Sequence, residues 1–155
     1  MSASTYLAKL YATIQSMKSN KPPISLSDPN WVIFSAQNPG AKKLDKFENL
    51  RLHEKLILEL KSCEADFQEV EGVYGGNVEL GVLIRHRNPY GNRLAALIAT
   101  QRLQESVLTA DGLIYRDGSC HKATSIVTYP KKPSGDYTKI GNQYVVVTID
   151  FSNKI

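Results

Sequence analysis

Residues 66–85 read DFQEVEGVYGGNVELGVLIR and predict a β-hairpin. The second half of this stretch alternates apolar residues with other side chains, which is the period of a strand: Val78, Leu80, Val82 and Ile84. Gly75-Gly76 separates the two halves, and glycines accept the positive φ angles of a two-residue hairpin turn. We therefore expect strands at 66–74 and 77–85, with Tyr74 opposite Asn77.

Helical patterns lie on both sides of the hairpin. Before it, apolar residues recur at helical spacing over 50–63, and Asp45 followed by Glu48 is typical of a helix N-terminus. After it, a second helix is indicated by Leu94, Leu97 and Ile98. Short apolar strands are expected at 31–37 and 106–109. This order, β-α-β-β-α-β, predicts an α+β fold in the form of a ferredoxin-like antiparallel sandwich.

The chain continues beyond this unit with further strands. Asp111-Gly112 and Asp117-Gly118 are hairpin signals, and residues 124–129 have a strand-like composition. We interpret residues 130–143 as a polar loop. A closing strand presents one apolar face, made of Val145, Val147, Ile149 and Phe151. The prediction is therefore the ferredoxin-like sandwich with extra C-terminal strands.

The first 30 residues are expected to stand apart from this domain. Apolar residues between Leu7 and Met17 recur at helical spacing, and Pro22-Pro23 then interrupts the pattern. We expect residues 1–30 to form an N-terminal helical extension and linker, and residues 31–155 to form a single α+β domain.

The composition argues against several classes of protein. The 155 residues are 42% hydrophobic and carry a formal net charge of +4, with basic residues spread along the chain. No apolar stretch approaches the roughly 20 residues of a membrane span, and we find no signal peptide. Nucleic-acid binding is not expected, because it usually needs a clustered basic stripe. Cys63 and Cys120 make no disulfide framework, so we expect reduced thiols in a cytoplasm and no metal site.

One candidate site residue is Glu69, in the first strand of the hairpin. With a two-residue turn it lies opposite Val82 and shares an apolar face with Phe67, where an unpaired carboxylate is costly and should hold a partner or ligand. A turn one residue longer would reverse its facing. An exposed edge strand that carries acids against aggregation explains Glu69 equally well, so both readings stay open.

Two further segments place polar side chains at element ends. Gln104 and Glu105 lie where the second helix leads into a strand, and side chains there can point into a crevice outside the sheet. Ser35 lies in 34–38, whose small and amide residues allow a ligand close to the backbone. A surface helix end and ordinary strand termination are the alternatives. No nucleophile–base motif and no glycine-rich phosphate loop accompany these segments.

Taken together, the three segments resemble the phage S-adenosylmethionine hydrolase/lyase family. Residues 32–36 are similar to that family's first strand, and Glu69 and Glu79 recur at the spacing of two acids there. The segment 104–108, Gln-Glu-Ser-Val-Leu, matches a family segment that reads Gln-Asp-Cys-Val-Leu. Residues 112–115 with Gly118 are similar to a Gly-Leu-Val-Tyr turn. The resemblance covers 32–118 at low identity.

This resemblance implies a lyase that depletes the S-adenosylmethionine of a phage-infected host and so counters restriction. The substrate's α-carboxylate attacks its own Cγ and gives methylthioadenosine and homoserine lactone, without a metal or cofactor. The resemblance implies Glu69 and Glu105 as catalytic acids, and it implies four substrate-binding residues: Ser35, Tyr74, Glu79 and Gln104. At Glu105 the family has a shorter acid. A homotrimer in the cytoplasm of the infected cell is implied as well.

Two other functions remain open at this point. In a hydrolase, Glu69 or Glu105 would act as general base on a water molecule and give homoserine directly. A non-catalytic phage inhibitor that binds a host protein is the second alternative, because a small α+β domain serves interaction as readily as catalysis.

Overall fold

The predicted hairpin forms in the computed structural model, which describes residues 26, 28–87 and 91–155. Strands β2 (Phe67–Tyr74) and β3 (Asn77–Arg85) pair antiparallel, with Tyr74 opposite Asn77 and Glu69 opposite Val82. Gly75 and Gly76 have φ angles of 57° and 81°, which glycine adopts without strain. The predicted turn length and register are therefore confirmed.

The elements around the hairpin follow the predicted order. Strand β1 (Trp31–Phe34) is followed by a short 3-10 helix, η1 (Pro39–Ala41), and by helix α2 (Lys46–Ser62). Helix α3 (Gly91–Gln101) and strand β4 (Ser106–Thr109) come after the hairpin. Asp45 caps α2 as expected, because its side chain accepts a hydrogen bond from the Glu48 backbone N–H at 2.9 Å.

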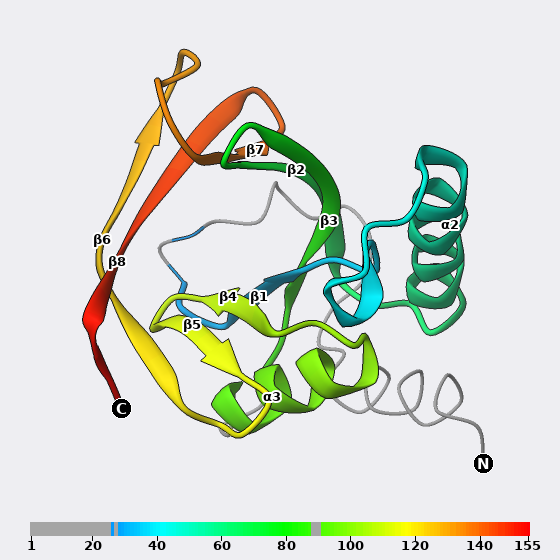
Figure 1. Ribbon diagram of the computed structural model, residues 1–155, viewed down its shortest axis with the longest axis horizontal. Helices are drawn as coiled ribbons and strands as arrows, with labels where there is room; N and C mark the ends of the chain where they lie inside the picture. The colour runs from blue at the N-terminus through cyan, green and yellow to red at the C-terminus, as the bar shows by residue number, and fades with distance from the viewer. Residues whose placement is uncertain (1–25, 27, 88–90) are drawn as a thin grey trace.

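The sheet closes on itself, so the prediction of an open ferredoxin-like sandwich is wrong (Figure 1). Four further strands follow β4: β5 (Gly112–Tyr115), β6 (Cys120–Tyr129), β7 (Tyr137–Ile140) and β8 (Gln143–Lys154). The described residues form an α+β protein with a closed antiparallel barrel in the order β1-β3-β2-β7-β8-β6-β5-β4. The circle is completed by pairing between β1 and β4, where Val32 lies opposite Thr109.

Strand β7 makes the closure possible. It lies inside the segment 130–143 that we interpreted as a loop, and it pairs with β2 on one side and β8 on the other. Ile140 faces Gln143 across Gly141-Asn142, a two-residue hairpin turn whose glycine has φ 58°. Without β7, the ribbon of β6 and β8 would remain attached only through β5, and the sheet would stay open.

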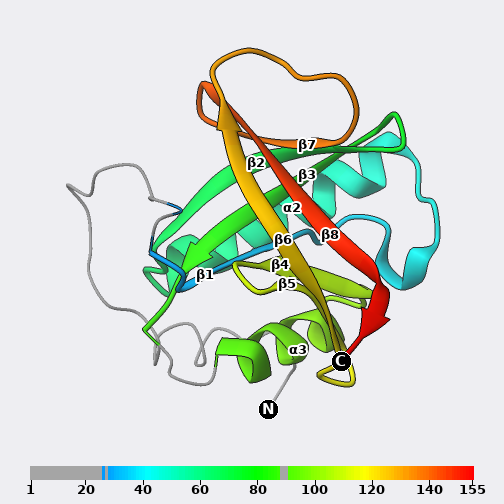
Figure 2. The same ribbon diagram turned by 90° about the vertical axis from the view of Figure 1, so that its left-hand side faces the viewer.

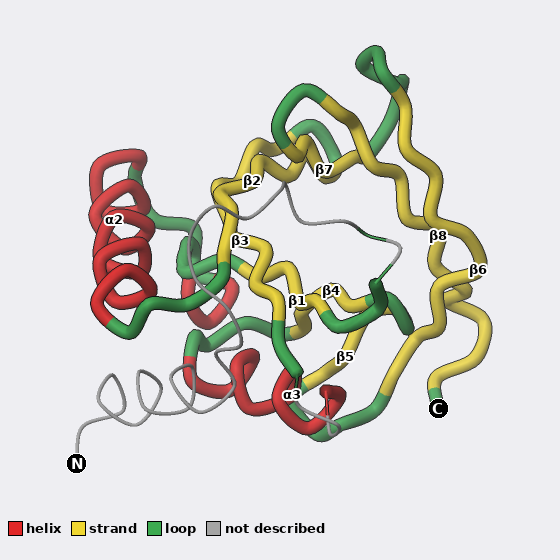
Figure 3. Tube along the Cα trace, turned by 180° about the vertical axis from the view of Figure 1, so that it is seen from behind, coloured by secondary structure: helices red, strands yellow, loops and turns green. Residues whose placement is uncertain are grey.

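The two described α-helices pack outside the barrel on neighbouring sides, α2 beside β3 and α3 beside β4 and β5 (Figures 1 and 3). Leu56 and Leu60 of α2 and Ile98 of α3 are buried in the same cluster as outward-facing residues of β1, β3, β4 and β5. The ribbon of β6 and β8 crosses the opposite side (Figure 2). A second cluster fills part of the interior with Trp31, Ile33, Val70, Leu83 and Leu108.

Most of the predicted N-terminal extension, residues 1–30, lies outside the described residues. Within 26, 28–87 and 91–155, no helix is long and apolar enough to cross a membrane.

Candidate functional site

One end of the barrel collects the polar strand ends, and we call it the mouth. Because every neighbouring pair of strands is antiparallel, β1, β2, β5 and β8 end where β3, β4, β6 and β7 begin. A cavity of about 350 Å³ extends from this end into the barrel. This volume lies in the range of small-molecule sites, and eight strands enclose just enough space for one small ligand.

The cavity has an apolar wall and a polar rim. Its apolar lining includes Ile33, Val70, Leu108, Leu113, Val147 and Ile149. Its polar lining consists of Ser35, Tyr74, Glu79, Gln104, Ser106, Asp136, Tyr137 and Thr138. Among the described lining residues there are two carboxylates and no lysine, arginine or histidine. The cavity therefore favours a ligand that is apolar in part and positively charged in part.

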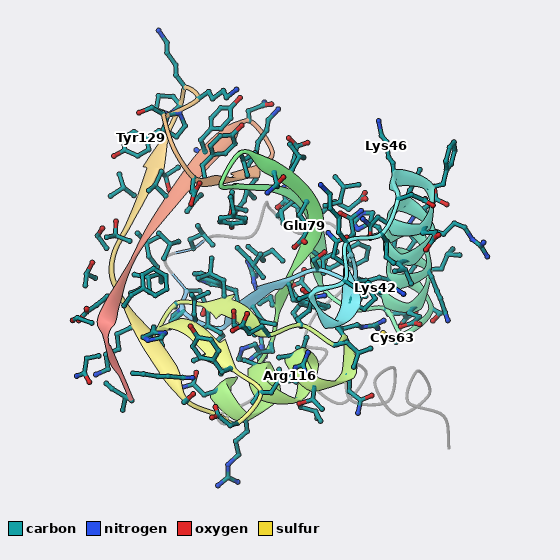
Figure 4. The ribbon with its side chains drawn as sticks, in the orientation of Figure 1. Lys42, Lys46, Cys63, Glu79, Arg116 and Tyr129 are labelled. Atoms are coloured by element: carbon teal, nitrogen blue, oxygen red, sulfur yellow. The ribbon has the colours of Figure 1, made fainter. Side chains whose placement is uncertain are left out.

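Four of the predicted site residues meet at this cavity. Ser35 follows β1, Tyr74 ends β2, Glu79 lies near the start of β3, and Gln104 precedes β4. Figure 4 shows Glu79 on the part of β3 that borders the barrel opening. These residues are separated in sequence, and the antiparallel register brings them to the same end of the barrel.

Glu69 lies outside the cavity. The residues of β2 that line the cavity are Val70, Gly72 and Tyr74, so Glu69 belongs to the other face of the strand. The apolar face on which we expected it is the face that packs against α2. Its side chain is 62% exposed, and its Oε1 lies 2.8 Å from Nε2 of the buried His53. The Glu69 carboxylate is therefore paired with the His53 ring and is otherwise exposed to solvent.

Glu105 is exposed and does not line the cavity either. Burial raises the pKa of the Tyr115 phenol, and the negative charge of the nearby Glu105 raises it further. The neighbouring Gln104 does line the cavity. Its Nε2 donates to the Gln37 carbonyl oxygen at 2.9 Å, which ties the start of β4 to the end of β1.

Glu79 is the partly buried acid of the cavity. Burial raises the pKa of its carboxyl, and hydrogen bonds with Asn38 and Ser35 oppose that rise. The single Ser35 hydroxyl proton serves either Glu79 or the Leu80 carbonyl oxygen, which is 2.7 Å from Ser35 Oγ. A cationic ligand beside Glu79 would favour the charged carboxylate and compensate for its desolvation.

Tyr74 presents an aromatic ring beside this acid. Its hydroxyl lies 2.5 Å from Thr138 Oγ1, and its ring lies over Gly72, where an added Cβ would come within 2.5 Å of the ring carbon Cε2. Burial raises the pKa of the Tyr74 phenol, and the charges of Glu79 and Asp136 raise it further. Two acids and one aromatic face therefore lie together on this side of the mouth.

Sequence reasoning missed Asp136 and Thr138, because the segment that contains them was interpreted as a loop. The Gly141-Asn142 pair, a known hairpin signal, could have revealed β7 and with it these two side chains. Phe151 was placed on the apolar face of the last strand but was not recognised as a cavity residue.

No group of three or more histidine, cysteine or acidic side chains that could hold a metal ion occurs in the described part of the chain. A scan against models of known protein families finds no match, and a search of curated proteins finds none either.

Proposed function

We propose that this protein binds S-adenosylmethionine in the mouth cavity and cleaves it as a lyase. One observation carries the proposal. Ser35, Tyr74, Glu79 and Gln104, which the resemblance to S-adenosylmethionine lyases assigns to substrate binding, come from three separate segments and line one cavity. Nothing in the hairpin register alone requires the strand ends of β1 and β4 to contribute to the same space.

The charge of the cavity suits this substrate. S-adenosylmethionine carries a positive sulfonium and a positive ammonium group, and the lining offers Glu79 and Asp136 without a basic side chain among the described residues. The face of Tyr74 adds a surface that attracts cations. A neutral or anionic ligand of the same size would gain no attraction between opposite charges from these groups. The apolar wall suits the nucleoside and the carbon atoms bonded to the sulfonium.

The reaction needs little from the protein beyond shape and charge. The α-carboxylate of the substrate attacks Cγ, the new C–O bond closes a five-membered lactone, and the Cγ–S bond breaks with its electron pair going to sulfur. No proton and no water are consumed. Opposite charges disappear in this step, so a cavity that excludes water favours it. Holding the methionine arm folded can contribute up to about 7–11 kcal/mol.

The residues of the lining have distinct parts in this scheme. Glu79 holds the cationic end of the substrate, and Asn38 orients that carboxylate by a hydrogen bond. Gln104 fixes the geometry between β1 and β4 at the rim. The described lining offers no histidine or cysteine, and intramolecular attack requires neither. Glu69 and Glu105 have no contact with the cavity in this scheme, and the homotrimer stays a prediction.

Product analysis tests the proposal. Purified protein is incubated with S-adenosylmethionine in H2-18O, and the products are identified by mass spectrometry. We expect methylthioadenosine together with homoserine lactone, and any homoserine formed later should carry the heavy oxygen in its carboxyl group. Homoserine labelled at the Cγ hydroxyl would replace the lyase by a hydrolase. Absence of methylthioadenosine would overturn the proposal and favour the non-catalytic inhibitor.

A further inference from the structure

A second group of side chains faces the acidic side of the mouth. It consists of Tyr115 at the end of β5, His121 at the start of β6 and Phe151 near the end of β8. In the strand order of the described barrel, β8, β6 and β5 lie at least three strands from β3 in either direction. These three rings therefore stand across the mouth from Glu79, and we call them the aromatic rim.

Phe151 is the member of the aromatic rim that lines the cavity. It continues the inward-facing row Val145, Val147 and Ile149 on β8, which also lines the cavity. Val145 is buried, whereas Phe151 is 66% exposed. A phenylalanine this exposed adds little to the stability of the barrel. Its ring is instead available to a ligand that enters the mouth.

The other two rings support Phe151 in series, because His121 contacts Phe151 and Tyr115 contacts His121. The ring centroids of His121 and Phe151 are 5.3 Å apart, a distance typical of packed aromatic pairs. His121 is fixed in turn by Tyr115, whose hydroxyl oxygen lies 2.6 Å from His121 Nδ1. The Lys154 ammonium lies 4.1 Å from the centroid of the Tyr115 ring. This chain of contacts restricts the ring of Phe151 although its surface is exposed.

The positions of Tyr115 and His121 place this support directly beside the cavity. Tyr115 pairs with Ser106, and His121 pairs with Leu113, and both partners line the cavity. Tyr115 also shares its face of β5 with Leu113. The two rings therefore lie next to residues that line the cavity, although they do not line it themselves.

From this geometry we infer that Phe151 is a stacking platform for a planar aromatic group of the ligand. Tyr115 and His121 are positioning residues for that platform. A ligand that spans the mouth meets the flat apolar ring of Phe151 on one side and the Glu79 carboxylate on the other, so a planar ring at one end and a cation at the other complement both. The inference rests on the proposed function and deepens it, because it places the purine of S-adenosylmethionine against Phe151 and its cationic arm beside Glu79.

Binding of methylthioadenosine, measured by calorimetry, tests the platform. This nucleoside has the purine but lacks the sulfonium and the amino-acid arm, and its binding does not require turnover. Phe151→Leu keeps an apolar side chain but removes the ring, and we expect it to weaken binding by about 5- to 150-fold, the range of one base–aromatic stack. Phe151→Tyr keeps the ring and should bind within about 2-fold of the wild type. Tyr129→Ala, which removes an exposed aromatic residue of β6 outside the cavity lining (Figure 4), is the matched control and should bind normally.

The positioning role has its own readout. Tyr115→Phe keeps the ring but loses the hydroxyl contact to His121 Nδ1, so we expect a weaker affinity for methylthioadenosine and a higher KM for S-adenosylmethionine, with kcat and the unfolding midpoint unchanged. A fall in kcat alone would contradict the positioning role. Equal methylthioadenosine affinity in wild type and Phe151→Leu, or no affinity in the wild type, would overturn the platform. Cleavage is judged separately by the product analysis, so the two proposals can fail independently.

Discussion

The barrel has two walls that are built differently. Strands β1 to β5 contribute to the cluster that packs against α2 and α3, and their central residues, such as Val32 and Ile84, are buried beneath the helices. Strands β6 to β8 are covered by no described helix, and alternate residues of β8 line the cavity (Figures 1 and 2). We call these parts the helix-backed wall and the bare wall.

The difference separates two tasks. The helix-backed wall holds Ser35, Glu79 and Gln104 at the ends of strands that are paired with their neighbours and packed against the helices. A site that orients polar groups requires such rigid support. The bare wall closes the barrel and supplies apolar and aromatic lining, including Phe151. Its interior residues, such as Ile126 and Ile140, are only partly buried against the interior cluster, so we expect it to be the less stable part of the molecule.

The largest effect is expected where the two walls join. Gly112 begins β5 with φ 132°, and an added Cβ would lie 2.1 Å from the His121 carbonyl oxygen on β6. Gly112→Ala must therefore push β5 and β6 apart, and we expect a loss of more than about 3 kcal/mol of unfolding free energy. Gly135→Ala is the control, because it also has a positive φ of 87° but meets no atom within 4 Å. It should cost only about 1–2 kcal/mol. Equal denaturant midpoints for the two variants would contradict this account of the join.

A smaller difference in unfolding free energy is expected between truncations of a buried residue at the helix-backed wall and of a partly buried residue at the bare wall. Leu60 of α2 is completely buried between helix and sheet, so Leu60→Ala should cost about 2–5 kcal/mol. Ile126 of β6 is only partly buried against the interior cluster, so Ile126→Ala should cost about 1 kcal/mol. Urea titration of both variants gives the comparison. A larger loss for Ile126→Ala would show that the bare wall carries more of the stability than its exposure indicates.

These contrasts explain how far the sequence predicts the fold. Local signals were sufficient for the hairpin, for α2 with its Asp45 cap and for the register of Glu69. Closure depends on β7, a strand of four residues between two turns, whose pairing with β2 joins segments more than 60 residues apart. Periodicity over four residues cannot reveal such a partner.

The same limit applies to the site. The segments around Ser35, Tyr74, Glu79 and Gln104 could be selected from the sequence, because polar residues at strand ends are visible there. The face of Glu69 could not be assigned to the cavity or to the helices, since both sides of β2 contact apolar residues. Asp136 and Thr138 entered the site only through β7.

The smallest expected effect is the loss of folding stability caused by burying the Glu79 carboxylate in the cavity. Burial raises the pKa of Glu79 above its ordinary value of 4.5. The folded protein therefore binds this proton more tightly than the unfolded chain, and stability falls as the pH rises from the ordinary value through the raised one. Glu79→Gln should raise the midpoint of thermal unfolding slightly at pH 7. The difference should vanish below pH 4.5, where wild-type Glu79 is neutral in both states. A destabilised variant at pH 7 would show that its hydrogen bonds outweigh its burial.

Turnover of S-adenosylmethionine in two matched glutamate variants decides whether the mouth cavity is the site of cleavage. Glu79→Gln and Glu69→Gln remove one charge each from neighbouring strands, the first inside the cavity and the second on the face toward α2. We predict that Glu79→Gln lowers kcat/KM on the order of 10²-fold, as loss of one electrostatic contact to a reacting group does. Glu69→Gln should remain within about 2-fold of the wild type, since it removes nothing from the lining. Loss of turnover in Glu69→Gln with full activity in Glu79→Gln would contradict the cavity as the site and place the chemistry on the outer face of β2.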